Sequence, residues 1–254
     1  MKIKRFWYEC SEHIRQPKNQ KQVYNWPQII QKIAFPPTCL LCGDHGEENL
    51  DLCRNCRDSL PYLHNPCRTC GLPLSGPELP SCGACLKNPP PFDRMVSAFR
   101  YEEPVRHLIH SLKFRSRHAN ARLLGSLLAE SIGTTQALPE IVIPVPLHPL
   151  RYQERHFNQA LEIARVVTSR LNLPLDYRTC HRIRPTNAQA RLNAGDRKKN
   201  IRQAFSVKLP LAYRHIGLLD DVVTTGATVR ELATMLRRAG ADQIDVWACA
   251  RALP

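Results

Sequence analysis

Four Cys-x-x-Cys pairs constrain this chain of 254 residues more than any other feature. The pairs follow one another at near-equal intervals: Cys39/Cys42, Cys53/Cys56, Cys67/Cys70 and Cys82/Cys85. Two cysteines this close in sequence suit one metal ion better than a disulfide between distant strands, and four thiolates are a common ligand set of structural Zn²⁺. The pattern therefore predicts a double zinc ribbon with two structural zinc sites.

The spacing of the pairs leaves open which pairs share a metal. The first two read C-x2-C-x10-C-x2-C and the last two C-x2-C-x11-C-x2-C. Neighbouring pairs can share an ion, and so can the first pair with the third and the second with the fourth. Redox chemistry is the competing role, but four tandem pairs do not resemble the βαβ context of thioredoxin-like proteins. A closed site of this kind would hold a small module against the rest of the protein or against nucleic acid.

Composition narrows the class of protein. Hydrophobic residues make up 43% of the chain, as expected for a globular core, and no apolar run approaches the roughly 20 residues of a membrane span. The basic N-terminus is not followed by the apolar segment of an export signal. These features predict a cytoplasmic protein that does not insert into a membrane.

The positive charge lies mainly in the C-terminal part. Of the net charge of +14, most follows Pro91, where 25 Lys and Arg stand against 14 Asp and Glu. The excess either keeps the protein soluble or attracts an anionic ligand, polyphosphate or nucleic acid. Prolines at Pro36-Pro37 and at Asn88 to Pro91 predict three parts. These are an N-terminal extension (1–36), the zinc ribbons (37–91) and a main domain (92–254).

Strands alternate with helices in the main domain. Apolar runs predict strands at Met95–Tyr101, Ile141–Val145, Ile216–Val223 and Ile244–Ala250. Apolar residues at helical spacing predict helices at Pro104–Lys113, His118–Ile132, Gln159–Leu171 and Ala227–Ala239. This alternation predicts an α/β fold, a parallel sheet flanked by helices. Ligands of such sheets bind beyond the carboxyl ends of the strands.

One predicted strand ends in two carboxylates, Asp220 and Asp221, before a turn into a helix. The turn consists of Thr224, Thr225, Gly226, Ala227 and Thr228. Backbone N–H groups at a helix start, together with threonine hydroxyls, form a pocket for phosphate. The carboxylates would repel a phosphate and suit sugar hydroxyls instead, so a pentose 5-phosphate fits both features. A helix capped by Thr225 or Thr228 is the alternative, but it leaves two carboxylates at a buried strand end unexplained.

This turn resembles the phosphoribosyl-pyrophosphate loop of type I phosphoribosyltransferases, and the resemblance covers roughly Phe92 to Pro254. It implies binding of 5-phosphoribosyl 1-pyrophosphate (PRPP), usually with Mg²⁺. Asp220 and Asp221 would then face the ribose hydroxyls, and the five residues of the turn would hold the 5-phosphate.

Two further segments carry arginines near predicted strand ends. Pro144 to Gln159 occupies the position where the type I family contacts pyrophosphate, and guanidinium groups of Arg151 and Arg155 offer paired donors to phosphate oxygens. A proline-stiffened turn with solvated arginines is the alternative. Arg178 to Arg202 holds eight Lys and Arg against one acid. Three roles are open for this segment: a lid over pyrophosphate, a surface that binds nucleic acid, or a solvated loop. As a lid, it would contact pyrophosphate through Arg184, Gln189 and Arg191.

Together with the cysteine pairs, these segments are similar to the ComF family. That family has a PVPLH stretch, an R-G-F-N-Q stretch and an R-x-x-T-x-x-Q-x-x-L segment. This chain has Pro144 to His148, then Arg155 to Gln159 with His156 in place of the glycine, and then Arg184 to Leu192. Leu112-Lys113-Phe114 resembles a basic segment of the family and would bring Lys113 toward the site.

The ComF resemblance implies a role in DNA uptake during competence or in use of DNA as a nutrient, with proteins of the uptake machinery as partners. Two functions remain open. One is phosphoribosyl transfer with release of pyrophosphate, in which Asp220, Asp221, Arg151 and Arg155 would be catalytic. The other is a non-catalytic factor that binds single-stranded DNA and uses the PRPP loop for sensing or regulation.

Overall fold

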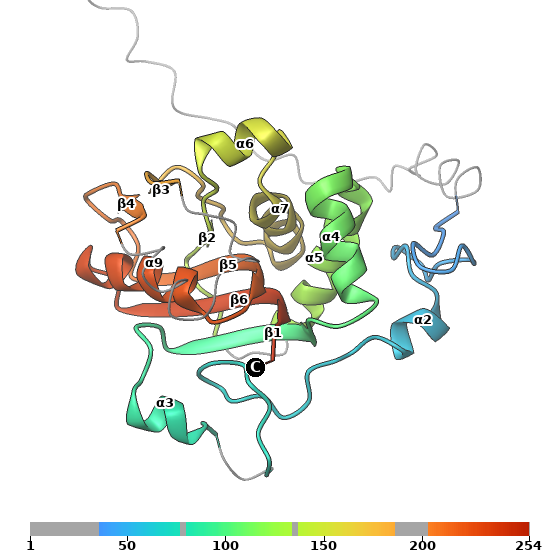
Figure 1. Ribbon diagram of the computed structural model, residues 1–254, viewed down its shortest axis with the longest axis horizontal. Helices are drawn as coiled ribbons and strands as arrows, with labels where there is room; N and C mark the ends of the chain where they lie inside the picture. The colour runs from blue at the N-terminus through green and yellow to red at the C-terminus, as the bar shows by residue number, and fades with distance from the viewer. Residues whose placement is uncertain (1–35, 77–79, 134–136, 186–202, 254) are drawn as a thin grey trace, which may run out of the picture. The chain divides into compact units, whose positions relative to one another are not determined.

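The computed structural model describes residues 36–76, 80–133, 137–185 and 203–253. Its central sheet has four parallel strands in the order β1-β6-β5-β2 (Figure 1). The strands are β1 (Arg94–Arg100), β2 (Ile141–Pro144), β5 (His215–Val223) and β6 (Gln243–Arg251). Each lies within two residues of its predicted range. They are almost wholly buried, because helices cover both faces of a parallel sheet.

Three helices pack on one face of the sheet and a fourth on the other. The first group is α4 (Val105–Arg115), α5 (His118–Gly133) and α7 (Gln159–Leu171). Its buried residues share one apolar cluster with Phe99 and Trp247 of the sheet. Helix α9 (Ala227–Arg238) shares a second apolar cluster with Ile143 and Leu218. The prediction of a parallel sheet flanked by helices is confirmed.

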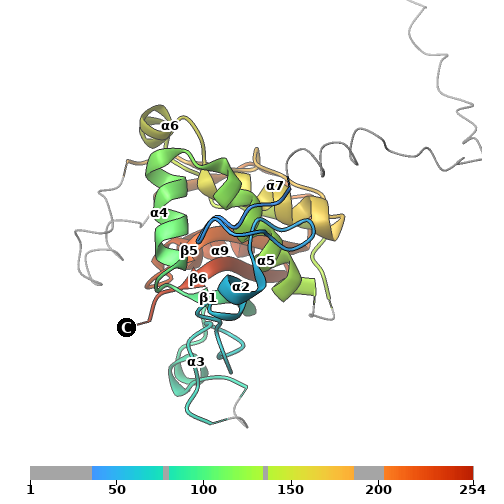
Figure 2. The ribbon, with the colours of Figure 1, turned by 90° about the vertical axis from the view of Figure 1, so that its right-hand side faces the viewer.

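The cysteine-rich segment runs along the edge of the sheet at β1, as Figures 1 and 2 show. The N–H of Leu63 donates to the carbonyl of Ala98 (3.2 Å), and the N–H of Arg100 donates to the carbonyl of Pro61 (2.8 Å). These bonds use backbone groups that an edge strand would otherwise expose. The segment also contains two short helices, α2 (Arg54–Asp58) and α3 (Gly83–Lys87). A small cysteine-rich module N-terminal to the sheet is thus confirmed.

Three short elements of the main domain do not appear among the predicted ones. Helix α6 (Pro149–Arg155) follows β2, and strands β3 (Cys180–Arg182) and β4 (Phe205–Val207) form an antiparallel pair of their own. The segment after β2 therefore contains a short helix, and contact of its arginines with pyrophosphate stays a prediction. Of the basic segment Arg178 to Arg202, residues 186–202 lie outside the described ranges, so Gln189 and Arg191 cannot be placed.

Residues Pro37–Pro254 cluster as one compact unit. The three-part division at residues 36 and 91 stays a prediction. Among the described helices, none is both long enough and apolar enough to cross a membrane.

Candidate functional site

The acidic pair stands at the carboxyl end of β5. Leu218 and Leu219 before it are fully buried, and Asp221 is 8% exposed. The N–H of Asp221 donates to a carboxylate oxygen of Asp220 at 2.9 Å. A buried carboxylate is costly unless a partner compensates its charge, so this pair requires cations nearby.

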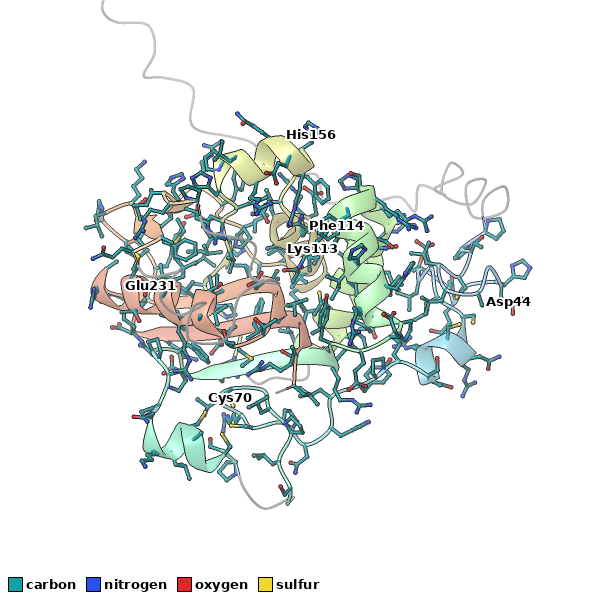
Figure 3. All side chains as sticks on the ribbon, in the orientation of Figure 1. Asp44, Cys70, Lys113, Phe114, His156 and Glu231 are labelled. Atoms are coloured by element: carbon teal, nitrogen blue, oxygen red, sulfur yellow. The ribbon has the colours of Figure 1, made fainter. Side chains whose placement is uncertain are left out.

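Lys113, near the C-terminal end of α4, supplies one such cation (Figure 3). Its ammonium group forms an ion pair with Oδ2 of Asp221. Burial alone would lower the pKa of Lys113, but attraction to Asp221 and Asp220 outweighs burial and raises this pKa. Burial and the charge of Asp221 raise the pKa of Asp220 to about 8, with Lys113 acting in the opposite direction. The site therefore contains a lysine that stays charged and a carboxyl group that is easily protonated.

The predicted phosphate loop follows β5 directly. Gly226 has a φ of +76° and is the N-cap residue of α9, so the N-cap position itself offers no side chain. The N–H of Ala227 makes only a long bond, 3.4 Å, to the hydroxyl of Thr225. Thr225 thus contributes to the start of the helix, as the alternative expected, and the phosphate pocket stays a prediction. A hollow at this point is lined by Asp220, Val222, Val223, Thr224, Gly226, Ala227, Thr228 and Val229.

Two arginines from other elements interact electrostatically with the acidic pair. Arg155, at the end of α6, lies with its guanidinium 5.2 Å from the ring centre of Phe114. Burial lowers the pKa of Arg155, and the charge of Asp221 opposes this change. Arg182 of β3 is likewise buried enough to lower its pKa, which the charge of Asp220 opposes. Both guanidinium groups are therefore within electrostatic reach of the carboxylates.

The other predicted arginines take different places. Arg151 forms an ion pair with Glu154 one turn further along α6, at 2.8 Å. Its charge acts on Arg182, so it remains near the site. Arg184 follows β3 and is exposed. The structure thus brings Asp220, Asp221 and Arg155 together and leaves Arg184 at the surface.

Arg182 was not among the predicted site residues, and Lys113 was included only through the family resemblance. Arg182 lies in a strand of only three residues, which is too short to show an alternation of apolar and polar residues. Lys113 shares α4 with other basic residues, and only its position on the helix directs it toward Asp221. The spacing of Lys113 from the apolar residues Ile109 and Leu112 was the available signal.

Two polar caps shape the segment between β2 and α7. Nδ1 of His148 accepts from the N–H of Leu150 (3.3 Å) and caps α6. Asn158 caps α7 by accepting from the N–H of Ala160 (3.0 Å), and its amide donates to the carbonyl of Val145 (3.0 Å). His156 has a φ of +62°, a left-handed conformation that favours glycine. His156 thus adopts a backbone conformation that the family glycine would also adopt readily.

The eight paired cysteines form two clusters from neighbouring pairs. The first cluster is Cys39, Cys42, Cys53 and Cys56, and the second cluster is Cys67, Cys70, Cys82 and Cys85. This arrangement decides between the two pairings that the sequence left open. In each cluster the third cysteine precedes a helix, α2 or α3, that carries the fourth.

Both clusters fit a tetrahedral zinc ion. Four thiolates about 2.3 Å from zinc lie roughly 3.8 Å from one another. The sulfurs of Cys42 and Cys53 are 3.6 Å apart, and those of Cys70 and Cys82 are 3.7 Å apart. Burial would raise the pKa of Cys67, but backbone N–H groups outweigh it and lower this pKa to about 6, as they do for Cys39. One thiol in each cluster therefore ionises readily, whereas burial and neighbouring thiols raise the pKa of Cys56 and Cys85.

The fold and the two four-cysteine clusters define an α/β protein with a double zinc ribbon. Residues 30–86 match the double zinc ribbon domain family. DNA utilization protein YhgH of Salmonella typhimurium is 37% identical over 227 residues, which are 87% of this chain and 100% of that protein. Competence protein F of Haemophilus influenzae is 37% identical over 226 residues, 84% of this chain and 96% of that protein. This chain belongs to the ComF family, together with these competence and DNA utilization proteins.

A solved structure also matches part of the fold. It is glutamine PRPP amidotransferase from B. subtilis, complexed with ADP and GMP. The two chains are 21% identical with a TM-score of 0.35, and the match covers 52% of this chain and 26% of the other.

Proposed function

We propose that this protein binds PRPP at the carboxyl end of β5 and transfers its phosphoribosyl group, with release of pyrophosphate, during the use of DNA taken up by the cell. One observation carries the proposal. Asp221 pairs with Lys113 of α4 and acts electrostatically on Arg155 of α6, next to the start of α9, whose N-cap residue is a glycine. A sugar with phosphates on two sides matches this arrangement of acidic, basic and N–H groups.

Each part of PRPP has a matching group in the site. The N–H groups and hydroxyls of Thr224 to Thr228 would hold the 5-phosphate at the start of α9. Asp220 and Asp221 would accept hydrogen bonds from the ribose hydroxyls. Arg155, with Arg151 beside it, would bind the pyrophosphate, because guanidinium pairs well with phosphate oxygens.

Transfer requires the bond between C1 of ribose and the pyrophosphate oxygen to break. The electron pair leaves with the pyrophosphate, and an acceptor atom then forms the new bond to C1 and gives its proton to solvent. Arg155 would stabilise the charge of the leaving group, while the carboxylate of Asp221 stabilises the positive charge on ribose. Lys113 would keep Asp221 ionised and in place.

The donor set also suits Mg²⁺ that arrives with the substrate. Mg²⁺ is commonly bound by one or two carboxylates together with substrate phosphates, and it keeps several waters. Asp220 and Asp221 provide two carboxylates, of which Asp221 is already paired with Lys113. When bound, the ion would neutralise charge on the pyrophosphate.

Isothermal titration of the full chain with PRPP and Mg²⁺ tests the binding proposal. We expect saturable heat from the natural protein and a loss of about tenfold or more in affinity in Asp220→Asn/Asp221→Asn. Asp242→Asn is the matched control, since its side chain is 72% exposed next to the start of β6. Equal heats in the natural protein and the double variant would reject the site.

The transfer step needs a separate measurement. Release of pyrophosphate from PRPP is measured across a panel of bases, nucleosides and single-stranded DNA. Release that depends on one acceptor supports transfer, whereas binding without release from any acceptor supports a sensing role for the loop.

A second candidate function, binding of single-stranded DNA, is favoured by the surface beside the site. Phe114 is 61% exposed and Tyr152 51% exposed, and Arg155 lies over the ring of Phe114. Exposed aromatics beside arginines suit stacking of bases and contact with phosphates. Phe114→Ala should then weaken binding of labelled single-stranded DNA several-fold at low salt, and no retention of DNA by the natural protein would remove this candidate.

A further inference from the structure

Arg251, the last residue of β6, is a buried side chain that joins two distant parts of the chain. It is 7% exposed, and all four of its acceptors are main-chain carbonyl oxygens. Nε donates to Cys70 at 2.9 Å. Nη1 donates to Val223 at 3.0 Å, to Ala252 at 2.8 Å and to Thr224. Because Cys70 belongs to the second cluster and Thr224 opens the phosphate loop, one guanidinium connects the metal cluster with the loop.

On the loop side, Arg251 fixes how the chain leaves β5. Each peptide group is planar, so the carbonyl of Thr224 and the N–H of Thr225 point in opposite directions in one plane. Holding that carbonyl on Arg251 directs the N–H of Thr225 away from Arg251. The bond to Val223 fixes the N–H of Thr224 in the same way. Arg251 therefore orients the first N–H groups of the loop proposed to hold phosphate.

On the cluster side, the acceptor is part of the turn that carries two metal ligands. The peptide group that follows the Cys70 carbonyl presents the N–H of Gly71, which donates to the carbonyl of Cys67 at 2.8 Å. The N–H of Met95 in β1 donates to the carbonyl of Arg68 in the same turn, at 2.9 Å. Metal-bound thiolates hold such a turn in shape, and small zinc modules lose structure without the ion. The position of the Cys70 carbonyl thus depends on the cluster.

The charge of the second cluster also acts on Arg251. Zn²⁺ with four thiolates carries a net charge of about −2, which favours a guanidinium ion nearby. Arg251 is mostly removed from water and is bound only to neutral carbonyl groups. Without its metal ion, the second cluster would no longer hold the Cys70 turn in shape. It would also lose the negative charge that stabilises the guanidinium of Arg251.

We propose that the metal of the second cluster maintains the shape of the phosphate loop through Arg251, which acts as a positioning residue. Loss of this metal loosens the loop and weakens phosphate binding, whereas loss of the metal in the first cluster does not. This inference rests on the proposed PRPP site for its effect on affinity. Its effect on the loop itself can be measured without any ligand.

The first cluster is attached elsewhere. Arg57, in α2 next to Cys56, forms ion pairs with Glu47 at 2.7 Å and with Glu130 of α5 at 2.6 Å. Arg122 of α5 pairs with Asp51. These contacts lead to α5, which does not carry the loop. The two clusters therefore provide a matched pair for an experiment.

Cys82→Ser and Cys53→Ser remove the third ligand of each cluster from the full, zinc-loaded chain. Zinc content should fall from two ions to one in both variants. In Cys82→Ser, amide hydrogen exchange over residues 219–230 should become faster, and the Kd for PRPP should rise about tenfold. In Cys53→Ser, both quantities should stay as in the natural protein. Equal effects in the two variants, or an unchanged loop in Cys82→Ser, would overturn the inference.

If Cys82→Ser does not fold, Arg251→Lys tests the same inference. A lysine retains the charge but cannot reach several carbonyls at fixed angles as a guanidinium can. We expect both zinc ions to remain, while exchange of the loop becomes faster and PRPP affinity falls. Unchanged exchange in this variant would contradict the role of Arg251. If the natural protein binds no PRPP, the proposed function is rejected. The hydrogen-exchange measurement still tests whether the second cluster is coupled to the phosphate loop.

Discussion

The two cysteine clusters share one local design and differ in their surroundings. In each, the glycine after the second cysteine has a positive φ, +84° for Gly43 and +70° for Gly71. Each glycine N–H donates to the carbonyl of the first cysteine, at 2.9 and 2.8 Å. A Cβ on Gly43 would meet no atom within 4 Å, whereas one on Gly71 would lie 2.9 Å from the sulfur of Met95. The same metal-binding turn is therefore open in the first cluster and packed against β1 in the second.

Two clusters with the same four ligands therefore support different parts of the protein. The first cluster is attached through Arg57, whose side chain is 32% exposed and pairs with partly exposed carboxylates. The second is attached through Arg251, which is buried and bound to carbonyls that open the phosphate loop. Exposed ion pairs add little to the free energy of unfolding, whereas removal of a buried charge with several hydrogen bonds lowers it strongly. We therefore expect the clusters to respond differently to matched changes.

The largest effect is expected from Arg251→Met. This change leaves the carbonyls of Cys70 and Thr224 without their buried donor, and it should lower the free energy of unfolding by about 3 kcal/mol or more. Chemical denaturation of the zinc-loaded protein measures this value. A loss below about 1 kcal/mol would show that water replaces the guanidinium easily and that the second attachment resembles the first.

Next in size is the pair Gly71→Ala and Gly43→Ala. Both place a side chain at positive φ, which costs about 1 kcal/mol. Only Gly71→Ala also forces Met95 to move, so it should destabilise by about 2 kcal/mol or more in total. The difference between the two melting curves isolates the packing against β1. Equal losses would remove the structural contrast between the turns.

The smallest effect is expected from Arg57→Met. Its ion pairs are partly exposed, so the change should cost about 0.5–1 kcal/mol and should depend on salt concentration. PRPP affinity should remain as in the natural protein, measured by titration under the same conditions. A loss of affinity comparable to that of Arg251→Met would mean that the first cluster also supports the loop.

Long, regular elements were predictable from the sequence. The strand at His215–Val223 and the helix at Gln159–Leu171 have continuous or periodic apolar residues, and their ends were found within one residue. Helix α6 was not predicted, since its seven residues include no buried ones. Strands β3 and β4 have three residues each, which is too few to show alternation.

The site was only partly predictable. Asp220 and Asp221 were predicted because charges at the end of an apolar run require an explanation. The pairing of the clusters was not, because spacings of ten and eleven residues are nearly equal. Arg251 gave no signal, since a charged residue at the end of a strand usually lies in solvent. Its role follows from the meeting of β6, the cysteine turn and the loop, which are distant in sequence.

Hydrogen exchange of the full zinc-loaded chain, with and without PRPP and Mg²⁺, measures directly whether Arg251 couples the second cluster to the loop. PRPP should slow exchange in the loop, residues 219–230, and in the second cluster, residues 67–85, because Arg251 joins them. Residues 39–56 of the first cluster should exchange at the same rate in both conditions. An unchanged loop would contradict the proposed site, and equal slowing in both clusters would contradict the coupling through Arg251.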